Sequence, residues 1–294
     1  MKIQTILVPV DFSSRMEPAI LHGSHIARQF NALPIFLHVV PQGPYPPAFV
    51  GAFPLDVRWI AKDESMERLR AELDRRVAAS LAAGTSRETI VTQGDPAEVI
   101  AATVAKRKVD LVVMPTAGTG AFRRWVLGST TTKVLNDVKI PVLTGAHVED
   151  ISAFSMQPYA RIGCAVDLGK GSEETLAWAK GFSDAYNSGP ITVIHAVPAP
   201  GIAMASGVAR GVDLKTDMEQ QAEEKLRSLL AGMDIQAETL VEIGWATSII
   251  PRAAKEADLD LLVIGRHSDD GVFAGLRTEA HGIISRSPCP VVSV

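Results

Sequence analysis

The chain has 294 residues, of which 47% are hydrophobic and 21% charged, and its formal net charge is -4. This length predicts two domains, because a domain typically contains about 100–200 residues. The apolar fraction is high enough to build hydrophobic cores, which excludes a wholly disordered chain. The 29 Lys and Arg residues against 33 Asp and Glu residues leave no overall basic field. We therefore do not expect nucleic acid as a partner.

The N-terminal stretch and the cysteines predict a cytoplasmic protein. Residues 1–11 form an apolar stretch that Gln4 interrupts and Asp11 ends, with no small-residue cleavage site, so the pattern is not that of a signal peptide. No run of about 18 uncharged apolar residues occurs, so no membrane-spanning segment is expected. The two cysteines, Cys164 and Cys289, form neither a disulfide framework nor a zinc cluster. Both are most simply interpreted as buried small hydrophobic residues.

Short apolar runs alternate with longer helical patterns along the first half of the chain. Ile6–Val10, Ile35–Val40 and Leu111–Met114 have the length of strands and carry no alternating polar face. This pattern is typical of strands that are buried on both sides of a parallel sheet.

Helices are expected between these strands. Glu17–Phe30 and Lys62–Ala83 place apolar residues at helical spacing. Pro96–Lys106 begins with proline at the first helical position and follows Asp95, a preferred N-cap residue. A further short helix is expected at residues 133–136. The alternation predicts an α/β fold, with helices on both faces of a mainly parallel sheet.

The second half of the chain repeats the first. Four sequence blocks return in the same order, at offsets between 149 and 157: residues 5–11 as 161–167, 35–40 as 192–197, 109–114 as 259–264, and 139–143 as 287–292. Four matches in order indicate a duplicated domain. We place the boundary near residue 155, between a first domain at 1–147 and a second at 158–294.

Candidate site residues follow the strands of the first half. Ligands of doubly wound sheets bind beyond the carboxyl ends of the strands. Asp11 follows the first strand and has acceptors for ribose hydroxyls. The segment after the strand Leu111–Met114 suggests a phosphate cradle, in which glycines let backbone amides approach an anion and a helix N-terminus adds partial positive charge. Its residues are Gly118, Gly128, Ser129 and Thr130.

An ordinary loop followed by a helix N-cap is an alternative explanation of Gly128 and Ser129, because serine and threonine are preferred at N-caps. No Walker A sequence and no G-x-G-x-x-G follows a strand. P-loop and dinucleotide-binding interpretations therefore have no motif support.

Three ordered blocks together resemble the universal stress protein family. They are residues 8–13 (Val-Pro-Val-Asp-Phe-Ser), residues 37–39 (Leu-His-Val), and Pro115-x2-Gly118-x9-Gly128-Ser129. The resemblance extends to both halves, so the chain is similar to a tandem member of this family. It implies two Rossmann-like domains of the adenine nucleotide alpha-hydrolase type, each with a five-stranded sheet.

The resemblance also implies an adenine nucleotide site in the first half, most often for ATP. Pro9 and Asp11 would flank the ribose, the backbone of Val39 would meet the adenine edge, and Met114 would pack near the nucleoside. The phosphates would be held by Gly118, Gly128, Ser129 and Thr130.

Pro115 departs from the family pattern, because it stands where the motif has its first glycine. Proline has no backbone N–H to donate and has a fixed φ. We therefore expect a first-half site with reduced affinity.

The second half departs further from the family pattern. Gly265 matches the first glycine, but Ser268 replaces the second, and Thr278-Glu279 replaces Gly-Ser. The carboxylate of Glu279, with Asp269 and Asp270 upstream, would repel a triphosphate. We expect no nucleotide in this half, although Asp167 is retained, and a structural role as partner domain.

The function implied by the resemblance is that of a cytoplasmic stress-response protein, regulated by ATP or a related adenine nucleotide. Family members associate through their last strands, which implies pairing of the two halves, a homodimer and a regulatory protein partner. Two alternatives stay open. One is a scaffold that has lost nucleotide binding and senses another ligand or partner; the other is a slow ATPase assisted by Asp11 or Arg124.

Several other residues invite functional interpretations. His38 and His195 recur at matching positions and are interpreted as core or strand-end histidines rather than catalytic ones. Arg123 and Arg124 either neutralise phosphates or form a solvated loop pair. The proline-rich, aromatic segment 43–59 is a lid, a docking surface or a packed connection. A metal site is the alternative interpretation of His267, Asp269, Asp270 and His281, but their spacing matches no compact ligand motif, and we expect a hydrated acidic loop.

Overall fold

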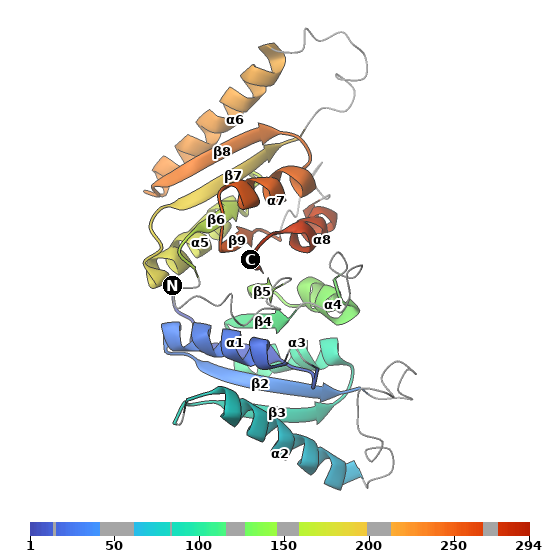
Figure 1. Cartoon of the computed structure of the whole chain (residues 1–294). Helices are drawn as coiled ribbons and strands as arrows, with labels where there is room; N and C mark the ends of the chain where they lie inside the picture. The colour runs from blue at the N-terminus through green and yellow to red at the C-terminus, as the bar shows by residue number, and fades with distance from the viewer. Residues whose placement is uncertain are drawn as a thin grey trace. The chain divides into compact units, whose positions relative to one another are not determined.

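The computed structural model describes residues 1–13, 16–41, 62–82, 84–115, 127–145, 159–198, 213–266 and 276–294. The chain forms two compact units, one containing Lys2–Thr116 with Gly128–Ala153 and the other containing Phe154–Val294. Figure 1 shows the elements of both along the chain. Residues 146–158, where the domain boundary is predicted, lie outside the described residues.

The first unit is a parallel sheet with the strand order β3-β2-β1-β4-β5. Its register places Leu7 beside Ile35 of β2 and Val112 of β4. The elements are β1 (Thr5–Pro9), α1 (Met16–Phe30), β2 (Leu33–Val40), α2 (Lys62–Ser80), β3 (Glu88–Gln93), α3 (Pro96–Arg107), β4 (Leu111–Pro115), α4 (Ser129–Asp137) and β5 (Val142–Gly145).

Helices cover both faces of this sheet (Figure 1). Helix α1 contacts β1, β2, β4 and α2, whereas α3 contacts β1, β2 and α4. The central strands are consequently shielded on both sides, and Ile6, Leu7 and Phe36 are fully buried. Burial on both faces explains why these strands lack alternating polar residues.

The second unit repeats this architecture with the strand order β10-β9-β6-β7-β8, and its described strand pairs are parallel. Helix α5 contacts β6, β7 and β9, α6 contacts β7 and β8, and α7 contacts β7 and α8. The elements are β6 (Ile162–Ala165), α5 (Ser172–Tyr186), β7 (Ile191–Val197), α6 (Asp213–Gly232), β8 (Ala237–Ile243), α7 (Ala246–Glu256), β9 (Leu261–Ile264), α8 (Leu276–Arg286) and β10 (Val291–Ser293).

An aspartate holds the start of the first strand in the same way in each unit. Asp110 Oδ2 accepts hydrogen bonds from the backbone N–H groups of Gln4 and Thr5, at 2.7 and 2.9 Å. In the second unit, Asp260 Oδ2 accepts from two successive N–H groups at 3.0 and 2.8 Å. The α/β fold and the two-domain layout predicted from the repeated blocks are confirmed.

Element boundaries differ from the predictions by a few residues. Asp95 caps α3 as predicted, since its Oδ1 accepts from the N–H groups of Ala97 and Glu98 at 2.9 and 3.2 Å. The predicted helix at 133–136 instead begins at Ser129, directly after the N-cap Gly128. Among the described helices, none combines the length and apolar character needed to span a membrane.

Candidate functional site

The predicted site residues of the first unit lie where the strand order reverses. From β1 the chain proceeds outward to β2 and β3 and then returns to place β4 on the other side of β1. Such a switch point leaves a crevice at the carboxyl ends of the two central strands. Pro9 ends β1, Asp11 follows it, Val39 is next to last in β2, and Met114 and Pro115 end β4. Sequence positions more than 100 residues apart are thus brought to one edge.

Helix α4 begins at the same edge without a side-chain cap. Its N-cap, Gly128, has φ -62° and ψ 148° and makes no side-chain hydrogen bond. The first N–H groups of a helix have no partner within the helix, so those of Ser129 and Thr130 are suited to an anion. Helix α3, in contrast, has the Asp95 carboxylate at its start. The Nζ atom of Lys133 lies 3.3 Å from that carboxylate, and α4 packs against α3.

Aromatic and polar groups surround Asp11. Its Oδ1 accepts a hydrogen bond from the backbone N–H of Ser13 at 3.2 Å, and also from the Ser13 hydroxyl. The ring of Phe12 lies 4.5 Å from that of His38, and the Arg76 guanidinium lies 5.4 Å from the Phe12 centroid. Arg76 comes from α2 and has no motif around it in the sequence. Sequence reasoning missed this cation beside Phe12.

Some residues of the predicted phosphate cradle, Gly118 and the neighbouring Arg123 and Arg124, lie outside the described residues. The proline-rich segment 43–59 and the acidic-loop residues His267, Asp269 and Asp270 lie outside them as well. Pro115 is in register with Gly145 of β5 at the end of its strand. The described residues include no group of three or more potential metal ligands.

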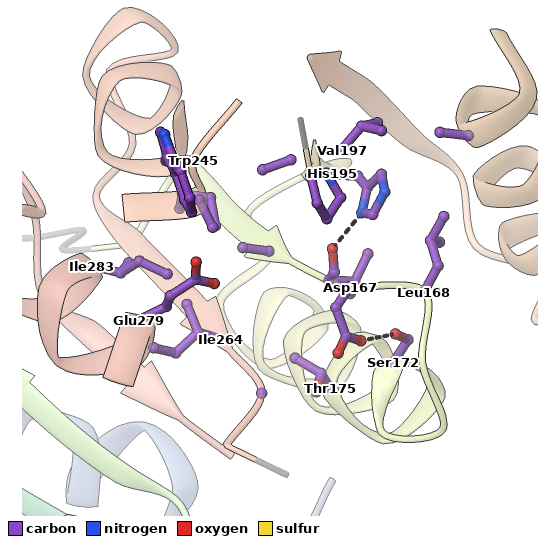
Figure 2. Close-up of a pocket in the computed structure, with 18 of the residues that line it drawn as sticks. Asp167, Leu168, Ser172, Thr175, His195, Val197, Trp245, Ile264, Glu279 and Ile283 are labelled. Atoms are coloured by element: carbon purple, nitrogen blue, oxygen red, sulfur yellow. Dashed lines mark hydrogen bonds between the residues drawn. The ribbon is translucent and has the colours of Figure 1, made fainter. Parts of the chain in front are cut away.

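A pocket of about 660 Å³ opens at the corresponding switch point of the second unit. It lies between the ends of β6, β7 and β9 and helices α5, α6, α7 and α8, and Figure 2 shows its lining. Its volume is in the range of small-molecule sites. The apolar lining includes Val166, Leu168, Val197, Met218, Ile250, Ile264 and Ile283. From the sequence, we expected only a structural role for the second half and did not predict a pocket there. The retained Asp167 was the residue that pointed to a site in this half.

Asp167 is held in place at one side of this pocket. Its Oδ1 accepts hydrogen bonds from the backbone N–H of Gly169 at 2.8 Å and from the Ser172 hydroxyl at 3.1 Å. Leu168, between them, has φ 60°, which is unusual for a residue with a side chain. His195 Nδ1 donates to the carbonyl oxygen of Val166 at 2.8 Å.

Both strand-end histidines are buried, which confirms their interpretation as hydrogen-bonded core residues. Burial lowers the pKa of His195 and that of His38, although the backbone hydrogen bond and the neighbouring aspartate of each oppose this shift. Both imidazoles are therefore neutral near pH 7. The cysteines are also buried, as predicted, and burial raises the pKa of the Cys289 thiol to about 12 and that of Cys164 still further.

Glu279 and Trp245 lie on the side of the pocket opposite His195 and Asp167 (Figure 2). Glu279 is in the first turn of α8 and is half-buried, and burial raises the pKa of its carboxyl group. Trp245 is the N-cap of α7 and is 72% exposed. Lys225 of α6 also lines the pocket, and its positive charge contributes to the lowered pKa of His195.

The strand order and the helices on the sheet define a class: each unit is a doubly wound α/β domain of the Rossmann-like type, with its switch point at the central strands. The chain belongs to the universal stress protein family, whose model matches residues 2–144 and 158–294. Two matches in one chain make it a tandem member, and the family resemblance drawn from the sequence is confirmed.

Relatives cover either one unit or the whole chain. A universal stress protein of Methanocaldococcus jannaschii is 32% identical over 143 residues, which cover 47% of this chain and 79% of the relative. Universal stress protein A homolog 2 of Coxiella burnetii is 26% identical over 141 residues, covering 47% and 97%. The crystal structure of a universal stress protein from Archaeoglobus fulgidus matches 99% of this chain and 96% of its own, with a TM-score of 0.66 and 20% identity. This last likeness concerns the fold.

Proposed function

We propose that the first unit of this tandem universal stress protein binds ATP or a related adenine nucleotide as a regulatory ligand in a stress response. The bound nucleotide would change conformation or partner binding rather than be turned over. The observation that supports this proposal best is the uncapped N-terminus of α4 at the switch point.

The polar groups at this edge match the parts of a nucleotide. The N–H groups at Ser129 and Thr130 suit phosphate oxygens, because they are unpartnered within α4 and the helix adds partial positive charge. The Asp11 carboxylate, at the end of β1, suits ribose hydroxyls. Met114, buried at the end of β4, supplies apolar contact for the nucleoside, as do Pro9 and the backbone of Val39 at neighbouring strand ends. Gly118 belongs to the same proposed set.

Pro115 reduces the affinity of the proposed site without removing it. The residue ends β4 and has no N–H to offer a phosphate. The N–H groups of α4 remain available, so the phosphates keep a second anchor. A scaffold that has lost nucleotide binding is the alternative that Pro115 favours.

The test measures nucleotide binding by isothermal titration calorimetry in three Gly128 variants. The backbone angles of Gly128 allow any residue, so all three should fold. We expect Gly128→Ala to retain affinity, because it adds neither charge nor a cap. Gly128→Asp should weaken ATP binding by at least about tenfold, since its carboxylate occupies the helix N-terminus and repels phosphate. Gly128→Asn, which caps without charge, should fall between them.

Equal affinity in Gly128→Asp and Gly128→Ala would refute the proposed site. No binding of millimolar ATP by the parent chain, and no nucleotide released on denaturation, would favour the scaffold. Phosphate release above a heat-treated control that disappears in Asp11→Ala would favour the slow ATPase.

We further propose a cytoplasmic location, a homodimer and a regulatory protein partner for this chain. The family resemblance supports these assignments, and the two buried cysteines suit a reducing compartment. Light scattering after size-exclusion chromatography, with and without ATP, tests the dimer, because a monomeric mass under both conditions contradicts it.

A further inference from the structure

We propose that the switch-point pocket of the second unit binds a small organic cation, with its apolar body in the pocket and its protonated nitrogen beside Glu279 and Trp245. The ligand of this unit would then differ in charge from the nucleotide proposed for the first unit.

The first step of the argument concerns shape and lining. The pocket of about 660 Å³ is lined mainly by aliphatic side chains, which suit the apolar body of a ligand. Trp245 projects at one side with 72% of its surface exposed. A ligand placed against this ring would remove a large apolar surface from water.

The second step concerns the charge inside the pocket. Among the residues that the structure describes, the charged ones in its lining are Asp167, Glu279 and Lys225. Asp167 and Lys225 shift the pKa of His195 in opposite directions, so both charges lie near this histidine. The neutral His195 adds no charge, so the described side chains of the lining carry two carboxylates against one ammonium. Glu279 lies on the side opposite His195 (Figure 2).

The third step concerns the state of Glu279. Within the part of the chain that the structure describes, no hydrogen bond or ion pair engages its side chain, although the residue is half-buried. Its carboxylate has thus lost water without gaining a partner, and burial raises its pKa. A cationic ligand would supply the missing partner, and a charged hydrogen bond to a carboxylate is among the stronger ones available.

The fourth step concerns the ligands that this arrangement disfavours. In the first unit, the N-terminus of α4 carries no acidic side chain in its first turn. In the second unit, the first turn of α8 carries Glu279. An anionic group placed there would face this carboxylate. The neighbouring indole favours the opposite charge, because the face of a tryptophan ring attracts cations.

The experiment compares three probes of equal length that differ in their head group: 4-phenylbutylamine, 4-phenylbutan-1-ol and 4-phenylbutyrate. Titration calorimetry on the full chain should give the amine a dissociation constant at least about tenfold below that of the butyrate. The alcohol should lie between them. Adenosine and AMP extend the comparison to nucleosides with and without a phosphate.

Two variants locate the effect. Glu279→Gln should remove most of the preference for the amine over the butyrate, whereas Trp245→Ala should weaken all three phenyl probes. Glu174→Gln is the matched control, because Glu174 is also a first-turn glutamate but lies on the surface outside the pocket lining. It should leave every affinity unchanged.

Three results would overturn the proposal: no binding of the amine at millimolar concentration, equal or tighter binding of the butyrate, or an unchanged preference in Glu279→Gln. Tighter binding of AMP than of adenosine or the amine that Gly128→Asp leaves unchanged and Glu279→Gln strengthens would identify the pocket as an anion site instead. Loss of nucleotide binding in the Gly128 variants would leave these outcomes unaffected, so the two proposals fail separately.

Discussion

His195 Nδ1 lies 2.8 Å from the carbonyl oxygen of Val166. Because a carbonyl oxygen only accepts hydrogen bonds, the neutral imidazole carries its proton on Nδ1 and donates from that atom. His38 and Val10 make the same bond in the first unit, at 2.9 Å. Each bond ties the second strand of its unit to the residue that precedes Asp11 or Asp167. The two histidines thus position the loops that carry these aspartates.

Removing this bond should destabilise the second unit. His195→Leu leaves the Val166 carbonyl without its buried imidazole donor, and we expect a loss of about 1–3 kcal/mol in the free energy of unfolding. His195→Asn should lose less, because its amide can donate from nearly the same position. Urea unfolding monitored by circular dichroism measures both. An equal loss in the two variants would show that ring packing, rather than the hydrogen bond, matters.

Restoring the family glycine should strengthen nucleotide binding. Pro115→Gly regains a backbone N–H and a free φ at the end of β4, beside the proposed phosphate site. We expect the dissociation constant for ATP to fall by about tenfold, the effect of one charge-assisted hydrogen bond. Pro115→Ala, which also has an N–H but a more restricted backbone, separates the two contributions. Unchanged affinity in both variants would show that the proline is harmless.

The fold could be predicted because each strand, helix and cap is indicated by a short stretch of sequence, and the repeat can be read by comparing the two halves. Apolar strands such as Ile6–Val10 and the cap Asp95 require no knowledge of distant residues, and the repeated blocks supply the duplication. The start of α4 at Ser129 was harder to predict from the sequence. Three threonines, Thr130–Thr132, are weak helix formers, and only burial of residues such as Val134 reveals that packing holds this helix.

The pocket of the second unit could not be predicted because its lining residues belong to seven separate elements. Met218 and Lys225 from α6 and Trp245 from α7 have no motif, and tertiary packing alone brings them beside Asp167. Glu279 was recognised as a charge that would repel phosphate, but its lack of a partner depends on the surrounding side chains. The sequence motif therefore predicted that the second unit rejects a triphosphate, but it did not indicate the cationic ligand that we propose from the structure.

Helix α1 packs against β1 through a glycine, which gives a direct test of the first core. A Cβ atom added to Gly23 would overlap the Cγ2 atom of Val8, a fully buried and stiff β-branched side chain. We expect Gly23→Ala to lower the free energy of unfolding by about 1–3 kcal/mol. Gly232→Ala is the control, since nothing lies within 4 Å of its added Cβ. A Gly23 variant as stable as this control would contradict the close packing.

Acid should destabilise the protein through a buried histidine in α1. Burial, with a smaller effect of His25, lowers the pKa of His22 from 6.5 to about 3. Above pH 6.5 the group is neutral whether folded or unfolded. As the pH falls toward 3, only the unfolded chain binds the proton, so stability decreases by up to about 1.4 kcal/mol per pH unit. His22→Gln cannot titrate, and its free energy of unfolding should fall less between pH 6 and pH 5, in urea titrations at about these values. Parallel pH dependence in the parent and His22→Gln would show that His22 does not contribute.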